Sequence, residues 1–130
     1  MDLEKLLHLD AVIHAPMRLA ILSILITVEN AQFTFLKEST GATDGNLSTH
    51  LAKLEGHGFI AIRKTFAGKK PQTLCAITEK GRAAFTEYLE QLEHIVKAPQ
   101  KQGKKTAGKE QAKQKNSIFL DFSPDNPYLD

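Results

Sequence analysis

The sequence has a single cysteine, no apolar run of membrane length and none of the short motifs that mark common enzymes. One thiol, Cys75, excludes an internal disulfide and a cysteine-rich metal site. The longest apolar stretch, residues 19–28, is about half as long as a membrane-spanning helix requires. The acidic start Met-Asp-Leu-Glu does not resemble a signal peptide. We therefore expect a cytoplasmic protein with no membrane segment.

Catalytic and metal-binding patterns are also missing. The chain contains no Ser-His-Asp signature, phosphate-binding loop, paired-carboxylate motif or metal-ligand spacing. Because their spacings match no ligand motif, we interpret four histidines as structural or solvated: His8, His14, His57 and His94. Cys75 lies in an apolar stretch, so we interpret it as a small buried hydrophobe, with redox sensing as the alternative. We expect no enzyme activity, no metal and no cofactor.

What the chain does have is an uneven distribution of charge. Its 130 residues allow one domain, and 42% apolar with 25% charged residues is ordinary for a globular protein. Residues 1–52 carry a net charge of −3, and residues 83–97 carry −2. Between them, residues 53–82 hold seven basic and two acidic residues, a net charge of +5. One basic block of this kind favours an anionic partner on one side of the domain.

Apolar periodicity predicts two helices near the N-terminus. The first covers residues 2–9, where Asp2 can cap the first turn. The second begins at Pro16, because proline suits the first position of a helix, and its apolar positions extend to Val28. We expect this second helix to be mostly buried.

Two further helices follow, separated by a tight turn. Thr34 is the predicted N-cap of the first, which ends at Thr40 with Gly41 in the left-handed conformation. Thr43 is the predicted N-cap of the second. The buried side of this second helix is predicted from residues that recur every three or four positions: Leu47, Leu51 and Leu54.

A β-hairpin and a final helix complete the predicted domain. Residues 59–66 and 73–77 are rich in β-formers, and residues 67–72 between them are typical of a hairpin turn with a basic tip. Thr78 can cap a final helix that stops before Pro99. Its apolar stripe consists of Phe85, Tyr88, Leu89, Leu92, Ile95 and Val96, and we expect the other side to carry Glu87, Glu90 and Glu93.

The order of the elements and the position of the basic block together indicate DNA binding. The block falls on the second helix of the helix-turn-helix pair and on the hairpin. A single helix fits the DNA major groove, and a neighbouring hairpin can reach the adjacent backbone or minor groove. The candidate site in the recognition helix consists of Thr43, Asp44, Asn46, Ser48, Thr49, His50 and Lys53.

These residues are assigned to two roles. Short polar side chains suit base edges, and we expect this role for Asn46, Ser48, Thr49 and His50. Cations suit phosphates, and we expect this role for Lys53, Arg63, Lys64, Lys69 and Lys70. Solvation alone is the alternative for His50, and for Lys69 and Lys70 at the hairpin turn.

The segment from Phe35 to Ile60 resembles the scaffold helix, turn and recognition helix of the MarR/ArsR-type winged-helix regulators. The most specific part is Asn-Leu-Ser-Thr-His-Leu, followed by Leu-Glu and Gly-Phe-Ile. Thr78-Glu-Lys-Gly-Arg82 resembles the family's junction after the wing. The resemblance covers residues 12–97 and implies a mainly α fold with a small β-hairpin wing (α+β), the winged helix-turn-helix. It also implies a dimeric, bacterial-type regulator that represses or activates promoters.

The chain departs from this family in two respects. It has no cysteine pair like that of the metal-sensing ArsR branch, so thiolate metal sensing is unsupported. It is shorter than most MarR proteins and lacks their long pair of terminal helices, which frame an effector pocket. The resemblance is therefore to regulators with a single winged-helix domain, and the sequence identifies no effector.

We predict three segments in the chain. Residues 1–97 are the winged helix DNA-binding and dimerisation domain, and residues 98–116 are a flexible Lys/Gln-rich linker, with a mobile DNA-binding arm as the alternative. Residues 117–130 are an apolar and acidic tail, for which docking is one interpretation. The apolar final helix favours a homodimer through residues 1–10 and 80–97, with half-sites about 10 bp apart. A winged-helix protein–protein interaction module without a DNA target is the alternative function.

Overall fold

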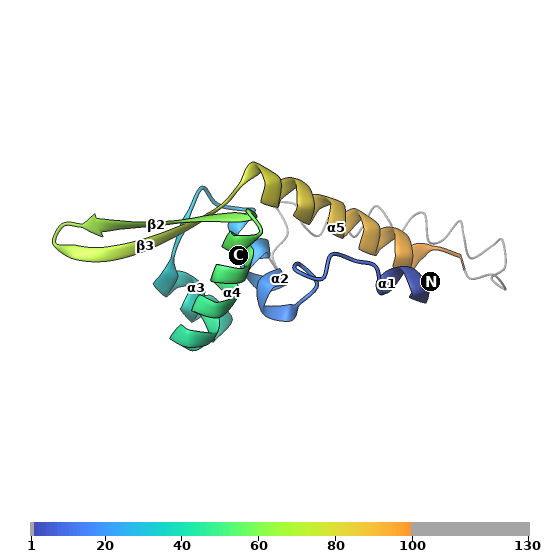
Figure 1. Cartoon of the computed structure of the whole chain (residues 1–130), viewed down its shortest axis with the longest axis horizontal. Coiled ribbons are helices and arrows are strands. Elements are labelled where there is room, and N and C mark those ends of the chain that lie inside the picture. The colour runs from blue at the N-terminus through green and yellow to red at the C-terminus, as the bar shows by residue number, and fades with distance from the viewer. Residues whose placement is uncertain (1, 100–130) are drawn as a thin grey trace, which may run out of the picture. The chain divides into compact units, whose positions relative to one another are not determined.

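The computed structural model describes residues 2–99, so the predicted tail and almost all of the predicted linker lie outside the described residues. The chain divides into two compact units. One is the 10–89 unit, and the other, the terminal unit, combines the residues up to Leu9 with those from Glu90 onward. The elements, shown in Figure 1, are α1 (Leu3–Leu6), α2 (Pro16–Leu25), β1 (Ala31–Gln32), α3 (Phe33–Thr40), α4 (Asp44–Gly56), β2 (Ile60–Ala67), β3 (Lys70–Ile77) and α5 (Glu79–Lys97).

The core of the 10–89 unit forms where α2 packs against α3 and α4, and where these three helices contact the sheet. Its fully buried side chains from these helices are Ile21, Leu22, Leu25, Leu36, Leu47 and Leu54. Helix α2 ends at Leu25, three residues before the predicted Val28, which is exposed. The buried side of α4 was predicted correctly, because Leu47, Leu51 and Leu54 recur at helical spacing.

The sheet has three antiparallel strands in the order β1-β3-β2. Strands β2 and β3 pair from Ile60 with Ile77 out to Ala67 with Lys70, so only Gly68 and Lys69 form the turn. The predicted turn over residues 67–72 was therefore too long. Gly68 has a φ of +66°, and a glycine at the first of two central positions is typical of one of the tight hairpin turns.

The junction between β3 and α5 depends on a close approach of two backbone segments. The Thr78 hydroxyl accepts a hydrogen bond from Gly81 N at 2.9 Å and donates to Gly58 O at 2.6 Å. Thr78 N donates to Phe59 O at 3.0 Å. Thr78 therefore caps α5, as predicted, and ties the helix to the chain just before β2.

The terminal unit differs from the sequence prediction at two points. Helix α1 covers only Leu3–Leu6, and the Asp2 side chain lies near Lys5 at 3.9 Å rather than capping the helix. Glu93, predicted on the exposed side of α5, is only 5% exposed, and its Oε1 lies 3.2 Å from Lys97 Nζ. An ion pair one helical turn away offsets the cost of burying this carboxylate. No helix among residues 2–99 is both long and apolar enough to cross a bilayer.

Candidate nucleic-acid interface

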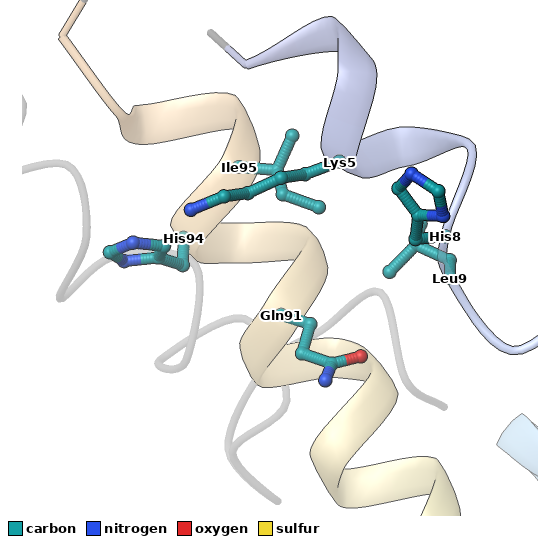
Figure 2. A pocket seen from close by; sticks show the side chains of 6 residues that line it. All are labelled: Lys5, His8, Leu9, Gln91, His94 and Ile95. Atoms are coloured by element: carbon teal, nitrogen blue, oxygen red, sulfur yellow. The ribbon is translucent and has the colours of Figure 1, made fainter.

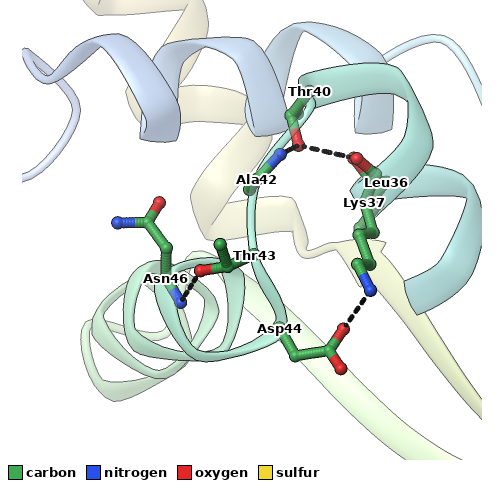
Figure 3. A network of polar contacts seen from close by, with 7 residues as sticks. All are labelled: Leu36, Lys37, Thr40, Ala42, Thr43, Asp44 and Asn46. Atoms are coloured by element: carbon green, nitrogen blue, oxygen red, sulfur yellow. Dashed lines mark hydrogen bonds and ion pairs between the residues drawn. The ribbon is translucent and has the colours of Figure 1, made fainter.

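The turn between α3 and α4 is held by local polar contacts, which Figure 3 shows. The Thr40 hydroxyl donates to Leu36 O at 2.7 Å and accepts from Ala42 N at 3.4 Å. Gly41 ends α3 with a φ of +72°, as predicted. The Thr43 hydroxyl accepts from Asn46 N at 3.1 Å, which confirms Thr43 as the N-cap of α4. These contacts fix the direction in which α4 leaves the turn.

Helix α3 begins one position before Thr34, so the prediction of Thr34 as its N-cap was wrong. The cap position is Gln32, which makes no side-chain cap. The Thr34 hydroxyl instead donates to Gln32 Oε1 at 3.4 Å. The start of α3 follows directly from the short strand β1, which pairs Ala31 with Cys75.

The face of α4 opposite its buried leucines presents Asn46, Thr49 and Lys53, three exposed residues at helical spacing. The Thr49 hydroxyl donates to Gly45 O at 2.8 Å, so only its lone pairs remain for a ligand. The Asn46 side chain makes no hydrogen bond to any described residue, although its backbone N takes part in the cap. Its amide is thus available as both donor and acceptor. Ser48 is exposed on the flank of the same helix.

His50 lies on the other flank of α4, where it is half-buried against Arg18 of α2. Arg18 Nη1 is 3.2 Å from His50 Nδ1, and because a guanidinium can only donate, the imidazole accepts there. A neutral imidazole then carries its proton on Nε2. The Arg18 guanidinium also donates to the carbonyls of Ala11 and Val12. Sequence reasoning missed Arg18, and the available signal was one arginine within an otherwise apolar helix.

Asp44, at the start of α4, forms an ion pair with Lys37 of α3, with Lys37 Nζ 2.9 Å from Asp44 Oδ1. The Lys37 side chain is 44% exposed and that of Asp44 is 73% exposed, so solvent screens the pair and it adds little to stability. The effect of this ion pair is electrostatic. The Lys37 ammonium offsets the negative charge of Asp44 beside the N-terminus of α4, the helix that carries the candidate site. Lys37 was not among the predicted site residues, and only the fold brings it to Asp44.

The hairpin carries the other predicted cations. Arg63, Lys64, Lys69 and Lys70 are all exposed, and within residues 2–99 none of them pairs with a carboxylate. Alternate residues of a strand point to opposite faces, so Arg63 and Lys64 lie on different faces of the hairpin. No acidic residue occurs between positions 56 and 78. Figure 1 shows β2 and β3 extending beyond α3 and α4, with their turn at the far end.

The cysteine and two of the histidines singled out in the sequence, Cys75, His14 and His57, contact other residues of the domain. Cys75 is fully buried, and burial, together with a smaller effect of the Glu55 charge, raises its pKa to about 11. The thiol therefore stays protonated at neutral pH, which supports its interpretation as a small hydrophobe. His14 Nδ1 lies 2.7 Å from the hydroxyl of buried Tyr88, whose pKa is raised by burial. His57 packs edge-on against Phe59.

The terminal unit contains a cavity of about 270 Å³, shown in Figure 2. Lys5, His8 and Leu9 line it from the N-terminal segment. Gln91, His94 and Ile95 line it from α5. Among the described residues, no group of three or more histidines, cysteines or carboxylates is placed to hold a metal ion.

Comparison with known proteins bears on the 10–89 unit most directly. The model of a family described as the winged helix DNA-binding domain matches residues 17–96. The chain is 37% identical over 86 residues to an uncharacterised protein of Methanocaldococcus jannaschii, a match that covers 66% of this chain and 94% of the relative.

Solved structures support the same fold. A transcriptional regulator homologue from Pyrococcus horikoshii OT3 matches with a TM-score of 0.66 and 27% identity, over 71% of this chain and 91% of that one. A MarR-family transcriptional regulator from Silicibacter pomeroyi matches with a TM-score of 0.52 and 14% identity, over 88% of this chain and 76% of that one. The second likeness concerns the fold alone. It agrees with the predicted α+β architecture of helices and a small β-hairpin wing.

Proposed function

The chain belongs to the winged helix DNA-binding domain family, and we propose that it is a homodimeric repressor that recognises specific double-stranded DNA sequences. The family and the structural neighbours are those of DNA-binding regulators of transcription rather than enzymes. The proposal adds four points to the family assignment. These are the dimer, the repressing role, the cytoplasmic location and the contacts of individual residues with DNA. The observation that carries it is the exposed polar face of α4 in the same unit as a hairpin rich in unpaired cations.

Helix α4 enters the major groove in this proposal. Asn46 is the strongest candidate for base recognition, because its free amide can form the two-point contact that asparagine makes with adenine. Thr49 lies beside it and can accept from a base amino group through the lone pairs of its hydroxyl. His50 offers its Nε2 from the flank, oriented by Arg18. Ser48 completes the set on the opposite flank.

Phosphate contacts fix the position of the helix without reading sequence. Lys53 serves this role from α4, and the hairpin serves it with Arg63, Lys64, Lys69 and Lys70. Thr43 caps the helix terminus that faces the DNA backbone, and Asp44 is tolerated there because Lys37 pairs with it. Since the cations release counterions from DNA on binding, affinity falls steeply as the salt concentration rises.

The homodimer forms through residues 1–10 and 80–97, so that residues 1–97 serve both DNA binding and dimerisation. Large apolar side chains are exposed in this region at Leu3, Leu7 and Val96. A second copy that packs on this region would remove these side chains from water. Two-fold symmetry then matches a pseudo-palindromic operator, and a dimer seated on a promoter excludes the transcription machinery.

Selection of bound fragments from random DNA at two salt concentrations tests the proposal. The selected sequence should contain two related half-sites. On it, Asn46→Ala should cost about 1–3 kcal/mol against the preferred base and little against random DNA. Lys69→Ala should weaken binding to both DNAs equally and lower the salt slope by about one.

Each variant is the control for the other, because one should change specificity and the other overall affinity. Equal losses on specific and random DNA for both variants would contradict the assigned roles. Absence of any selected sequence, with a protein partner lost when Lys69 and Lys70 are both replaced by glutamate, would instead establish an interaction module without a DNA target.

A further inference from the structure

We propose that the tip of the hairpin inserts Phe66, backed by Pro71, into the minor groove and bends the DNA there. This inference rests on the proposed function and extends it from phosphate contact to recognition of DNA deformability. It assigns a role to an aromatic residue that the predicted site does not contain.

Besides its cations, the hairpin carries one large exposed aromatic side chain, Phe66. It is 70% exposed, near the end of β2, and Pro71 of β3 lies directly opposite it in the register. Strand alternation places Phe66 on the same face as Ile60 and Ile62. Ile60 is buried and Ile62 half-buried at the base of the hairpin. On this face the pair of Lys64 and Thr73 separates Ile62 from Phe66 and Pro71. At 3.3 Å per residue, Phe66 therefore lies about 13 Å past Ile62, as a separate apolar site near the hairpin turn that is 70% exposed.

The charges around this apolar tip select the kind of partner. Lys64 lies on the same face as Phe66, two residues before it, and Lys69 and Lys70 lie at the turn. No carboxylate occurs in the whole hairpin. An aromatic ring whose charged neighbours in the hairpin are all cations fits a polyanion that also offers flat apolar surfaces. Duplex DNA has both properties, since its phosphates border a groove whose floor is the edges of the base pairs, and the flat base faces become accessible where a step is unstacked.

The dimensions of the groove determine which part of the hairpin can enter it. The minor groove is about 6 Å wide, whereas two paired strands are already about 4.8 Å apart before their side chains are counted. The ribbon as a whole therefore stays outside, and only a side chain at its tip fits. Phenylalanine and proline are among the wedges that enter between base steps, unstack them and kink the duplex by about 20–90°.

Insertion of this kind selects sequence without hydrogen bonds to bases. Unstacking is easiest at pyrimidine–purine steps, so the operator should prefer TA or CA/TG where the tip contacts it. This sequence preference is separate from the one that α4 confers. In the proposal, the base step under the hairpin tip lies outside the base pairs that Asn46 and Thr49 reach. Phe66 is therefore a second determinant of specificity.

The test uses the full chain with a selected operator that carries a dye at each end and 2-aminopurine at the step under the tip. Wild-type protein should shorten the end-to-end distance measured by energy transfer and raise the 2-aminopurine fluorescence. Phe66→Ala should abolish both signals and weaken binding about 5- to 150-fold, the range for loss of one aromatic–base stack. Phe66→Leu should restore part of both, because leucine is also a wedge.

Phe35→Ala is the matched control. Phe35 is also exposed, at 51%, but it lies on α3 and lines a pocket with Gln72 and Leu74 of β3, not with Phe66 or the turn residues. Its removal should therefore leave the bend and the fluorescence unchanged. Because both rings are exposed, thermal unfolding should show that both variants fold.

Four results would overturn the inference. If wild-type protein binds its operator without a bend, or if Phe66→Ala behaves like wild type, the insertion is wrong while the proposed function stands. If Phe66 is needed for binding anionic vesicles but not DNA, the tip is a membrane contact instead. If wild-type protein selects no DNA at all, the proposed function fails together with the insertion.

Discussion

Gly81 has no freedom to carry a side chain. A Cβ built there would lie 1.9 Å from Phe59 O and 2.7 Å from its carbonyl carbon. Those atoms are backbone and are held by the hydrogen bond from Thr78 N. Gly81→Ala should therefore force α5 away from the start of β2 and lower the free energy of unfolding by about 1–3 kcal/mol or more. Chemical denaturation monitored by circular dichroism measures this change.

Gly45→Ala provides the control for that prediction. Gly45 lies in α4, and a Cβ there meets nothing within 4 Å. Alanine favours helix over glycine by up to about 1 kcal/mol, so this variant should be neutral or slightly stabilising. Equal destabilisation by both substitutions would show that the close approach at Gly81 is not responsible.

Helix α4 depends on its cap more than α3 does. Thr43→Ala removes the hydroxyl that accepts from Asn46 N, and such a loss typically costs about 1 kcal/mol. The same substitution at Thr34 removes no cap, because within residues 2–99 that hydroxyl bonds only to Gln32 Oε1. Thr43→Ala should lower the denaturation midpoint measurably, and Thr34→Ala should change the free energy of unfolding by less than about 0.5 kcal/mol. A larger loss for Thr34→Ala would contradict this ranking.

Elements were predictable where the determining residues are neighbours in sequence. The caps at Thr43 and Thr78, and the left-handed Gly41, depend on residues within three or four positions. Strand β1 was missed because two residues show no alternation, and it exists only because β3 pairs with it. The hairpin turn was predicted to be too long because strand pairing, which is not visible in the local sequence, also determines where the strands end. Lys70 does not favour a strand by itself, but pairing with Ala67 extends β3 to it.

At the scale of the whole molecule, the proposed dimer makes the spacing of the two half-sites decisive. Inserting 5 bp between them turns one half-site to the opposite side of the duplex, so only one α4 can bind. Loss of the second contact should weaken binding about 100-fold or more. Fluorescence anisotropy with the original and the lengthened operator measures the loss. Changing the spacer sequence at constant length is the control.

Sedimentation equilibrium at the protein concentrations used for binding provides an independent check. A monomer under those conditions, or equal affinity for both spacings, would refute the dimer. Substitution of exposed Leu7 by glutamate should shift the protein towards monomer and remove the effect of spacing. Binding to a single half-site should survive, because Leu7 lies outside the 10–89 unit.

The sequence predicted the outward-facing residues of the candidate site on α4, but not the neighbours that contact them from other helices. The outward positions Asn46, Thr49 and Lys53 follow from the leucine spacing, and all three are exposed. Arg18 escaped prediction because it lies 32 residues from His50 and reaches it only when α2 packs against α4. Lys37 is seven residues from Asp44, but the two lie on different helices, so helical periodicity does not pair them. Periodicity identifies which side of a helix faces outward but not which neighbour will share that side.

The two-residue turn at Gly68 and Lys69 also limits how this hairpin can change during evolution. Since pairing is continuous up to the turn, adding or deleting one residue from each strand would exchange the faces of every position beyond the change. Phe66 would then point where Ala67 points now. Hairpins that keep an apolar tip on this face should therefore differ in length by even numbers of residues per strand, a parity that an alignment of relatives would reveal.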